Sequence, residues 1–246
     1  MKNLISILFV SLNLVIVACD EQTQWNPIPD QWSEAGDTNG PIKLNDTSNF
    51  QTEAAKTAHH ASFQLKENTI YDGSWVNIGY PGGDPGYQQG VCTDVVIRAL
   101  RFIHIDLQEL IHKDMKVAHD TYNTKYTTKK LDNNIDHRRT QNIQTYLTRM
   151  GAKIPIPKKI SDYKPGDIVF WDIAAGHTGI VSNKRSPNHG GFMVIHNIGS
   201  GAQEEDLLYN WDPIEVYRIT DDIIAKMKKN CTFKYDQTKD FKRYVQ

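Results

Sequence analysis

The sequence has few cysteines, little net charge and no internal repeat. Three cysteines stand among 246 residues, so a framework of several disulfide bonds is not expected. HExxH and Cys-x-x-Cys, the spacings typical of zinc sites, are absent, and we expect neither a metal nor a cofactor. The formal net charge is −1 at pH 7, which excludes a nucleic-acid binder that works by bulk electrostatics.

Residues 1–18 have the pattern of a secretory signal peptide. Lys2 precedes an apolar run over residues 4–17, which is shorter than a typical transmembrane helix. The letters IVAC that end the run resemble a bacterial lipobox, so we predict that Cys19 is lipidated and becomes the first residue of the mature chain. The alternative is an ordinary secretory signal. Both predict export to the bacterial cell envelope, and a lipid would anchor the protein to a membrane, facing the periplasm or the outer surface.

Polar segments are predicted on both sides of one folded domain. Residues 19–62 are rich in Asn, Gln, Asp and Thr, which predicts a lipidated N-terminus followed by a tether. Residues 63–222 are the expected catalytic domain. Residues 223–246 hold seven Lys/Arg against two Asp/Glu, which predicts a basic C-terminal helix and tail. Thr220, followed by two aspartates, is typical of a helix N-cap, so we expect the last helix to begin there.

A loop rich in glycine and proline leads to Cys92, where a predicted helix begins. After the cysteine, apolar residues recur at helical spacing at Val95, Val96, Ala99 and Leu100. A helix N-terminus carries partial positive charge, so we expect a lowered pKa and a nucleophilic role for the Cys92 thiol. The alternative is a small apolar core residue. A disulfide to Cys231, which we expect to be a free or partly buried thiol, would exclude the nucleophile.

The second half of the chain predicts an α+β layout and supplies partners for the thiol. Three strands are expected within residues 162–172, 177–183 and 191–199. Two of them carry a histidine, His177 and His196, and either side chain can take or orient a proton. Apolar spacing also predicts helices over 107–119 and 140–150, before the strands. Zinc ligation by Cys92 and the two histidines is the main chemical alternative.

The order of these elements resembles the NlpC/P60 superfamily of papain-like cysteine peptidases. In that superfamily a Tyr-x-x-Gly-Gly element precedes the nucleophile, and Tyr80 begins such an element here, twelve positions before Cys92. The segments GVCTDVVIRALR, NIDHRR and HNIGSGAQEED are more closely similar to an uncharacterised bacterial family, a domain of unknown function that groups with this superfamily. The match covers roughly residues 63–220. At the cysteine itself, VCTD replaces the Asp-Cys-Ser-Gly that NlpC/P60 enzymes usually show.

The resemblance implies a papain-like α+β domain of NlpC/P60 type, with helices packed on a mostly antiparallel sheet. It also implies a cysteine hydrolase, an amidase or endopeptidase, in which Cys92 attacks a carbonyl carbon. His177 is then the general base, and His196 orients it. Asn197 is the alternative orienter, because strand alternation lets only one of these two neighbours point into the same cleft.

Export and the resemblance together imply an amide bond of peptidoglycan stem peptides as the substrate. Two other functions stay open. The same Cys-His pair serves an acyl or amide transferase, and a catalytically silent wall-binding or scaffold lipoprotein would keep the fold without the chemistry. The expected partners are this substrate and the membrane that holds the lipid, whereas the oligomeric state does not follow from the sequence.

Further residues are predicted at the oxyanion hole and at the substrate. The Cys92 backbone amide, with the Tyr80 hydroxyl, is expected to bind the oxyanion. Asp94, His137 and Arg138 are expected to face the substrate, with a guanidinium group that clamps a carboxylate. The alternative for residues 134–139 is a structural ion-pair cluster that locks the loop. The acidic residues of segment 201–208 are either a cleft rim or only solvated.

Overall fold

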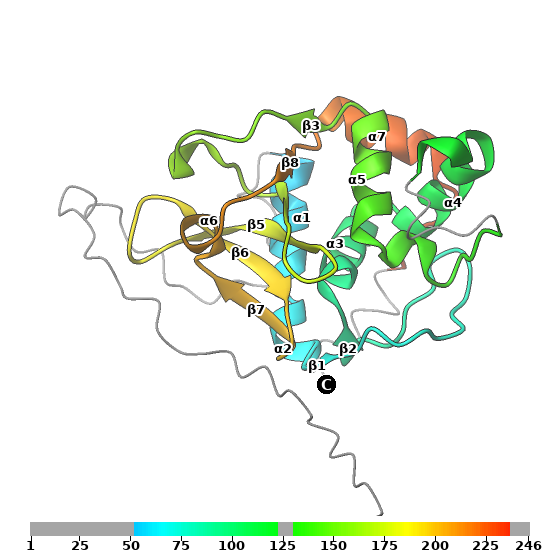
Figure 1. Cartoon of the computed structure of the whole chain (residues 1–246), viewed down its shortest axis with the longest axis horizontal. Coiled ribbons are helices and arrows are strands. Elements are labelled where there is room, and N and C mark those ends of the chain that lie inside the picture. Colours follow the sequence, from blue (N-terminus) through cyan, green and yellow to red (C-terminus); the bar gives the residue numbers. More distant parts are fainter. Residues whose placement is uncertain (1–51, 123–129, 237–246) are drawn as a thin grey trace, which may run out of the picture.

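The computed structural model describes residues 52–122 and 130–236, which form an α+β fold and confirm the predicted class (Figure 1). The helices are α1 (Glu53–Ser62), α2 (Gln64–Glu67), α3 (Cys92–Arg101), α4 (Leu107–Ala118), α5 (Thr140–Arg149), α6 (Leu207–Asn210) and α7 (Asp221–Asn230). The strands are β1 (Ile70–Tyr71), β2 (Gln89–Gly90), β3 (Lys153–Ile154), β4 (Ile168–Trp171), β5 (His177–Arg185), β6 (Phe192–Asn197), β7 (Ala202–Glu205) and β8 (Glu215–Tyr217).

Six strands form one antiparallel sheet in the order β3-β8-β4-β5-β6-β7. The three strands predicted from the sequence are β4, β5 and β6, which are neighbours at its centre. Their registers pair Trp171 with His177 and Gly179 with His196. The short strands β1 and β2 pair in parallel as a separate sheet, and β2 leads directly into α3 (Figure 1).

The sheet packs against a different layer on each face. The main core lies between the helices and one face, where Ile168, Phe170, Ile180 and Ile195 are buried. A smaller cluster on the opposite face contains Val169, Trp171, Val181 and Val194, together with Leu207 of α6. Because each fully buried side chain of this kind stabilises the fold by about 1.5–3 kcal/mol, both clusters fix the sheet firmly. The centre of the sheet is therefore a rigid support for the residues at the strand ends.

Local sequence signals set the ends of the predicted helices. The Asp106 carboxylate accepts a hydrogen bond from the Gln108 amide at the start of α4. α5 is followed by Gly151, which has a φ of 80°, the left-handed conformation that glycine adopts easily. At α7 the Thr220 hydroxyl accepts from the amide of Ile223, as the N-cap prediction requires.

Two predicted domain boundaries are corrected by the packing. α1 belongs to the folded domain and not to a tether, because Ala58, His59 and Ala61 are buried against α3 and β5. The boundary at 222/223 cuts α7, whose Lys228 forms an ion pair with Glu53 of α1 at 2.9 Å. Polar composition misled both predictions, since short amphipathic helices bury only one stripe of side chains.

The predicted signal peptide and the lipidation site Cys19 lie outside the described residues. Within residues 52–122 and 130–236, no helix is both long and apolar enough to cross a membrane.

Candidate active site

Cys92 is the first residue of α3, as predicted, and its side chain is 6 % exposed. The preceding residue, Val91, is extended with a φ of −123°, and its amide donates to the Asp94 carboxylate at 2.7 Å. This bond satisfies one backbone donor at the helix start, where the first four amides have no partner within the helix. The Asp94 side chain thus fixes the backbone that carries the cysteine.

Burial raises the pKa of the Cys92 thiol to about 11, against the lowered pKa that the sequence predicted. The backbone amides of Thr178, Thr93 and Cys92 itself act in the opposite direction but do not compensate. The rise corresponds to roughly 3 kcal/mol, whereas a helix N-terminus contributes only about 0.3–1 kcal/mol to an exposed charge. Desolvation therefore dominates, and the resting side chain is a neutral thiol.

The two predicted histidines are joined in a relay that ends on a carboxylate. His177 Nε2 lies 3.0 Å from His196 Nδ1, and His196 Nε2 lies 2.7 Å from Glu205 Oε2. His177 is the first residue of β5, His196 lies on the neighbouring strand β6, and Glu205 ends β7. Adjacent strands of the sheet thus supply the three groups in order.

The carboxylate fixes the tautomer of both rings. An ionised Glu205 can only accept, so His196 Nε2 carries the proton and donates it to Glu205. His196 Nδ1 is then the acceptor, and His177 Nε2 donates to it. In a neutral His177 ring this leaves Nδ1 without a proton and able to act as a base.

Both rings lie among indole rings on the face of the sheet that contains Trp171. The His177 ring is centred 5.7 Å from Trp171 and 5.9 Å from Trp211, and the His196 ring 6.1 Å from Trp211. Burial lowers the pKa of His177 to about 3, with a further contribution from His196. Burial also lowers the pKa of His196, although the Glu205 hydrogen bond opposes this. Both histidines are therefore neutral at neutral pH.

Cys92 meets β5 one residue beyond His177, at the amide of Thr178. This contact brings the helix start to the end of β5 that carries His177. The histidine rings themselves lie on the face of Trp171, whereas α3 packs on the opposite face, against Ile180 and Ile195.

Asn197, the alternative orienter, supports the nucleophile loop. It is fully buried, and its Nδ2 donates to the Gly90 carbonyl at 3.0 Å and to Asn68 Oδ1 at 3.3 Å. Gly90 lies two residues before Cys92. Strand alternation accounts for the difference from His196, because neighbours on a strand point to opposite faces.

The structure places Tyr71, and not Tyr80, beside Cys92. Tyr80 packs against His112 of α4, with ring centroids 5.2 Å apart, and burial and the nearby Glu109 raise its pKa. Tyr71 pairs with Gly90, two residues before Cys92, in the β1-β2 sheet, and burial raises its pKa. Tyr71 was missed because the Tyr-x-x-Gly-Gly spacing pointed to the other tyrosine.

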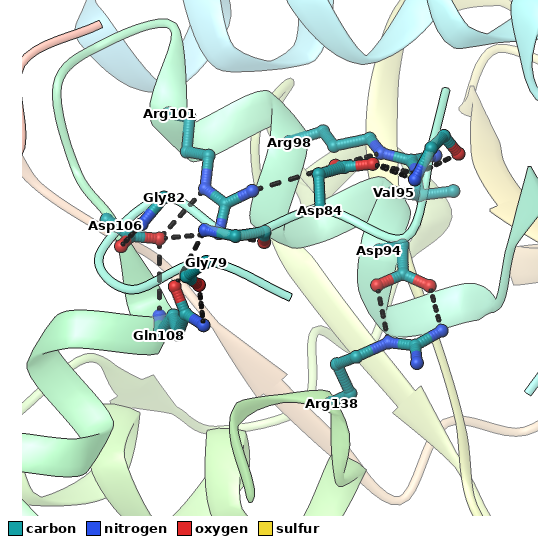
Figure 2. Close-up of polar contacts among 12 residues, drawn as sticks. Gly79, Gly82, Asp84, Asp94, Val95, Arg98, Arg101, Asp106, Gln108 and Arg138 are labelled. Carbon is teal, nitrogen blue, oxygen red and sulfur yellow. Dashed lines mark hydrogen bonds and ion pairs between the residues drawn. The ribbon is translucent and has the colours of Figure 1, made fainter. Parts of the chain in front are cut away.

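Asp94 and Arg138 pair with each other instead of facing a substrate (Figure 2). Arg138 Nε donates to Asp94 Oδ1 at 2.9 Å and its Nη2 to Asp94 Oδ2 at 2.8 Å, and both side chains are buried. His137 is also buried, and burial lowers its pKa well below the usual range. His137 and Arg138 belong to the 3-10 helix η3 (Asp136–Arg138), and the pair of Arg138 with Asp94 joins this helix to α3. The structure thus corrects the predicted substrate clamp to the ion-pair alternative.

Glu205, the end of the relay, was predicted from the sequence only as part of a cleft rim or a solvated acidic loop, and not as a partner of His196. The register could have found it, because β6 and β7 pair His196 with Gln203 and Val194 with Glu205. A residue two positions from the direct partner lies diagonally on the same face, within reach of a long side chain.

Cys92 and Cys231 are both free and buried. Burial raises the pKa of Cys231 to about 11 as well, so ionisation does not distinguish the two thiols. Their surroundings do, since Cys231 Sγ donates to Glu109 Oε2 at 3.3 Å. Glu109 also accepts from the amides of Thr232 and Phe233, and the Phe233 ring lies against Gly82. Cys231 therefore belongs to a structural contact that holds the C-terminal segment.

Among residues 52–122 and 130–236, no group of three His, Cys, Asp or Glu side chains is arranged to hold a metal ion. The candidate site consists of a buried thiol at the start of α3 and a neutral histidine relay on adjacent strands.

The chain belongs to a family described as a domain of unknown function (DUF1287), whose model matches residues 58–219. This confirms the predicted membership of such a family. A relative from Escherichia coli (strain K12), named uncharacterized protein YijF, is 46 % identical over 163 residues, which cover 65 % of this chain and 79 % of the relative. No solved structure matches the chain.

Proposed function

We propose that the protein is a cysteine hydrolase that cleaves an amide bond, with a papain-like domain of NlpC/P60 type. The observation that carries the proposal is the relay His177–His196–Glu205, whose first residue precedes Thr178, the residue whose amide contacts Cys92. Because the rings and α3 lie on opposite faces of the sheet, the proposed proton transfer runs through a water at the end of β5. A nucleophile, a base and a group that orients the base are the three parts that nucleophilic catalysis requires.

The proposed reaction begins with neutral groups. Nδ1 of His177 takes the proton of the Cys92 thiol through the bridging water as the sulfur attacks the carbonyl carbon, and the carbonyl oxygen becomes negative. The backbone amide N–H groups at the start of α3 stabilise this oxygen, since they have no partner within the helix. The C–N bond then breaks, and His177 gives its proton to the leaving amine, which leaves a thioester on Cys92.

Water resolves the thioester in the second half of the reaction. His177 takes a proton from water as the oxygen attacks the thioester carbon, and returns it to the Cys92 sulfur as the C–S bond breaks. The products are the amine, a carboxylic acid and the free thiol. His196 and Glu205 hold the ring and stabilise the imidazolium that forms in both halves.

For the substrate, we infer an amide bond in peptidoglycan stem peptides. The support is the secretory pattern of residues 1–18 and the lipobox at Cys19, which would hold the domain at the bacterial cell envelope beside the wall. A lipid anchor of this kind also defines the membrane as the second partner.

A digest of purified peptidoglycan, with products resolved by mass, tests the proposal. Wild-type protein should release fragments that differ from the substrate by one hydrolysed amide bond, and Cys92→Ala should release none. Cys231→Ala is the matched control, because this thiol is equally buried but lies in the C-terminal contact, and it should keep activity. Products that incorporate an added amine instead of water would establish the transferase, and binding to the wall without any product would favour the silent module.

A further inference from the structure

The segment that carries Tyr71 and Trp75 lies alongside the residues that lead into Cys92. β1 pairs Tyr71 with Gly90, and the Asp72 amide donates to the Gly90 carbonyl at 3.1 Å. Gly73 comes so close to Val91 that an added Cβ would lie 3.4 Å from its side chain. Residues 70–75 therefore form one wall beside the nucleophile.

Arg138 fixes this wall to the nucleophile helix. Its guanidinium binds the Asp94 carboxylate in two bonds and also donates to the carbonyls of Ser74 and Asp72, at 3.4 Å each. Asp94 lies two residues beyond Cys92 on α3 (Figure 2 shows the pair). Separating the wall from the helix would break this buried pair and leave an uncompensated charge, which is costly. We therefore expect the wall and the helix to stay together.

Large apolar side chains on this wall are exposed although their backbone is fixed. Ile70 is 51 %, Tyr71 46 % and Trp75 57 % exposed. The Trp75 indole N–H donates to Asp132 Oδ2 at 2.9 Å, which anchors one edge of the ring while the ring stays open to solvent. Three large apolar side chains exposed within residues 70–75, one of them held at its edge by a hydrogen bond, are the observation that points to a ligand at this wall.

We propose that Tyr71 and Trp75 form a platform for a sugar ring, so that the enzyme cleaves a stem peptide that is still attached to its glycan. The proposal rests on the proposed hydrolase and names the form of its substrate. Aromatic rings and carboxylates alternate along the wall, with Asp72 between the two aromatics and Asp132 at the indole edge. A sugar presents a flat C–H face to a ring and hydroxyl donors to carboxylates.

Two other occupants fit this surface less well. An apolar peptide side chain needs a concave pocket, whereas the rings of the wall are half exposed. An anionic lipid surface would be repelled by the carboxylates of Asp72 and Asp132. A neutral sugar ring can pack on the aromatic side chains and donate its hydroxyl groups to the carboxylates.

Binding to the inactive Cys92→Ala protein tests the platform without requiring turnover. The probes are the disaccharide-peptide released from purified peptidoglycan by a muramidase and the same stem peptide without sugar. The disaccharide-peptide should bind more tightly, and Trp75→Ala in the Cys92→Ala background should weaken its binding roughly threefold to tenfold while leaving the free peptide unchanged. Trp75→Phe keeps a ring and should restore most of the affinity.

Two further variants separate stacking from other roles. Tyr71→Phe keeps the ring and removes the hydroxyl, so it should preserve binding, whereas Tyr71→Ala should not. Ile156→Ala removes an exposed apolar side chain elsewhere, 43 % exposed, and should have no effect.

Equal affinity of the two probes, or an equal loss for both in Trp75→Ala, would overturn the platform. A Trp75-dependent binding to phosphatidylglycerol vesicles, without a change for the disaccharide-peptide, would also overturn it and favour a lipid contact. The proposed hydrolase is tested separately. Trp75-dependent sugar binding without cleavage by the wild type would support the platform and contradict the hydrolase. Cleavage that is unchanged in Trp75→Ala would support the hydrolase and contradict the platform.

Discussion

At Cys92, burial and the helix N-terminus act on the thiol in opposite directions, and burial is the stronger. The proposed chemistry therefore depends on a neutral thiol and a neutral imidazole that exchange a proton during attack. This differs from a resting ion pair of thiolate and imidazolium, which would need a raised pKa for His177. Burial instead lowers that pKa to about 3.

The pH dependence of alkylation tests this resting state. Because burial raises the pKa of Cys92 to about 11, its thiolate fraction should rise about tenfold per pH unit between pH 6 and 9. The rate at which iodoacetamide labels Cys92 in the Cys231→Ala protein, followed by mass, should rise in the same proportion. A rate that is already constant from pH 5 upward would contradict the neutral pair.

The relay predicts unequal effects for His196 on β6 and Glu205 on β7. His196→Ala should reduce kcat about 10²-fold with little change in KM, because a misaligned base affects the transition state more than substrate binding. Glu205→Ala should reduce kcat by roughly tenfold, since the Glu205 side chain is 47 % exposed and water can replace it.

Asn197→Ala is the matched control for this series. It removes the bond to the Gly90 carbonyl, so it should cost about 1–3 kcal/mol of unfolding free energy and change kcat less than His196→Ala. Urea unfolding of each variant separates stability from turnover. A larger kcat loss in Asn197→Ala would reverse the two roles.

The sequence predicted Cys92, His177 and His196 as site residues because each lies at the start of or within a strongly patterned element. It did not predict that Glu205 bonds His196 or that Tyr71 pairs with Gly90, because these contacts depend on pairing between segments, β7 with β6 and β1 with β2. Asp94 and Arg138 were placed at the substrate for the same reason: charge alone does not tell whether two distant residues pair. Long-range register is what a single sequence leaves open.

At the scale of elements, the glycine-rich loop is held by side chains of α3 and α4 (Figure 2). Arg98 binds the Asp84 carboxylate at 2.8 Å and also donates to the carbonyls of Gly86 and Gln89. From α4, Gln108 accepts from the Gly83 amide at 2.8 Å. The sequence predicted the helices and the loop, but not that buried arginines would join them.

Two glycines of this loop should respond differently to alanine. A Cβ on Gly83 would lie 1.9 Å from the Gly79 carbonyl oxygen, so Gly83→Ala must displace backbone, and we expect a loss of about 2 kcal/mol or more. A Cβ on Gly79 would have nothing within 4 Å, and Gly79→Ala should stay within about 0.5 kcal/mol of the wild type. Thermal unfolding of the two variants measures the difference, and equal melting temperatures would show that the loop adapts.

At the scale of the whole molecule, buried histidines make the fold sensitive to acid. Burial lowers the pKa of His60 to about 3, with His59 adding to the effect, and the pKa of His177 is lowered to about 3 in the same way. In the unfolded chain both titrate near 6.5. Between these values the unfolded state binds more protons, so the unfolding free energy should fall as the pH falls below about 6.

The expected slope is about 1.4 kcal/mol per pH unit for each histidine that stays neutral. His60→Phe is a direct test, because the His60 ring is stacked on Phe102 with centroids 4.1 Å apart and an interplanar angle of 4°. The variant should keep the stack and lose one histidine's share of the slope in urea unfolding from pH 6 to 4. An unchanged slope would assign the acid sensitivity to other groups.

The contact between Phe233 and Gly82 has a consequence for the order in which the molecule is completed. A ribosome releases the glycine-rich loop long before it releases the residues that brace it, and the proposed export would thread the chain in the same direction. Domains fold as units once their parts are available. The proposed chemistry at Cys92, which depends on this loop, is therefore expected to begin only after the C-terminal segment has arrived.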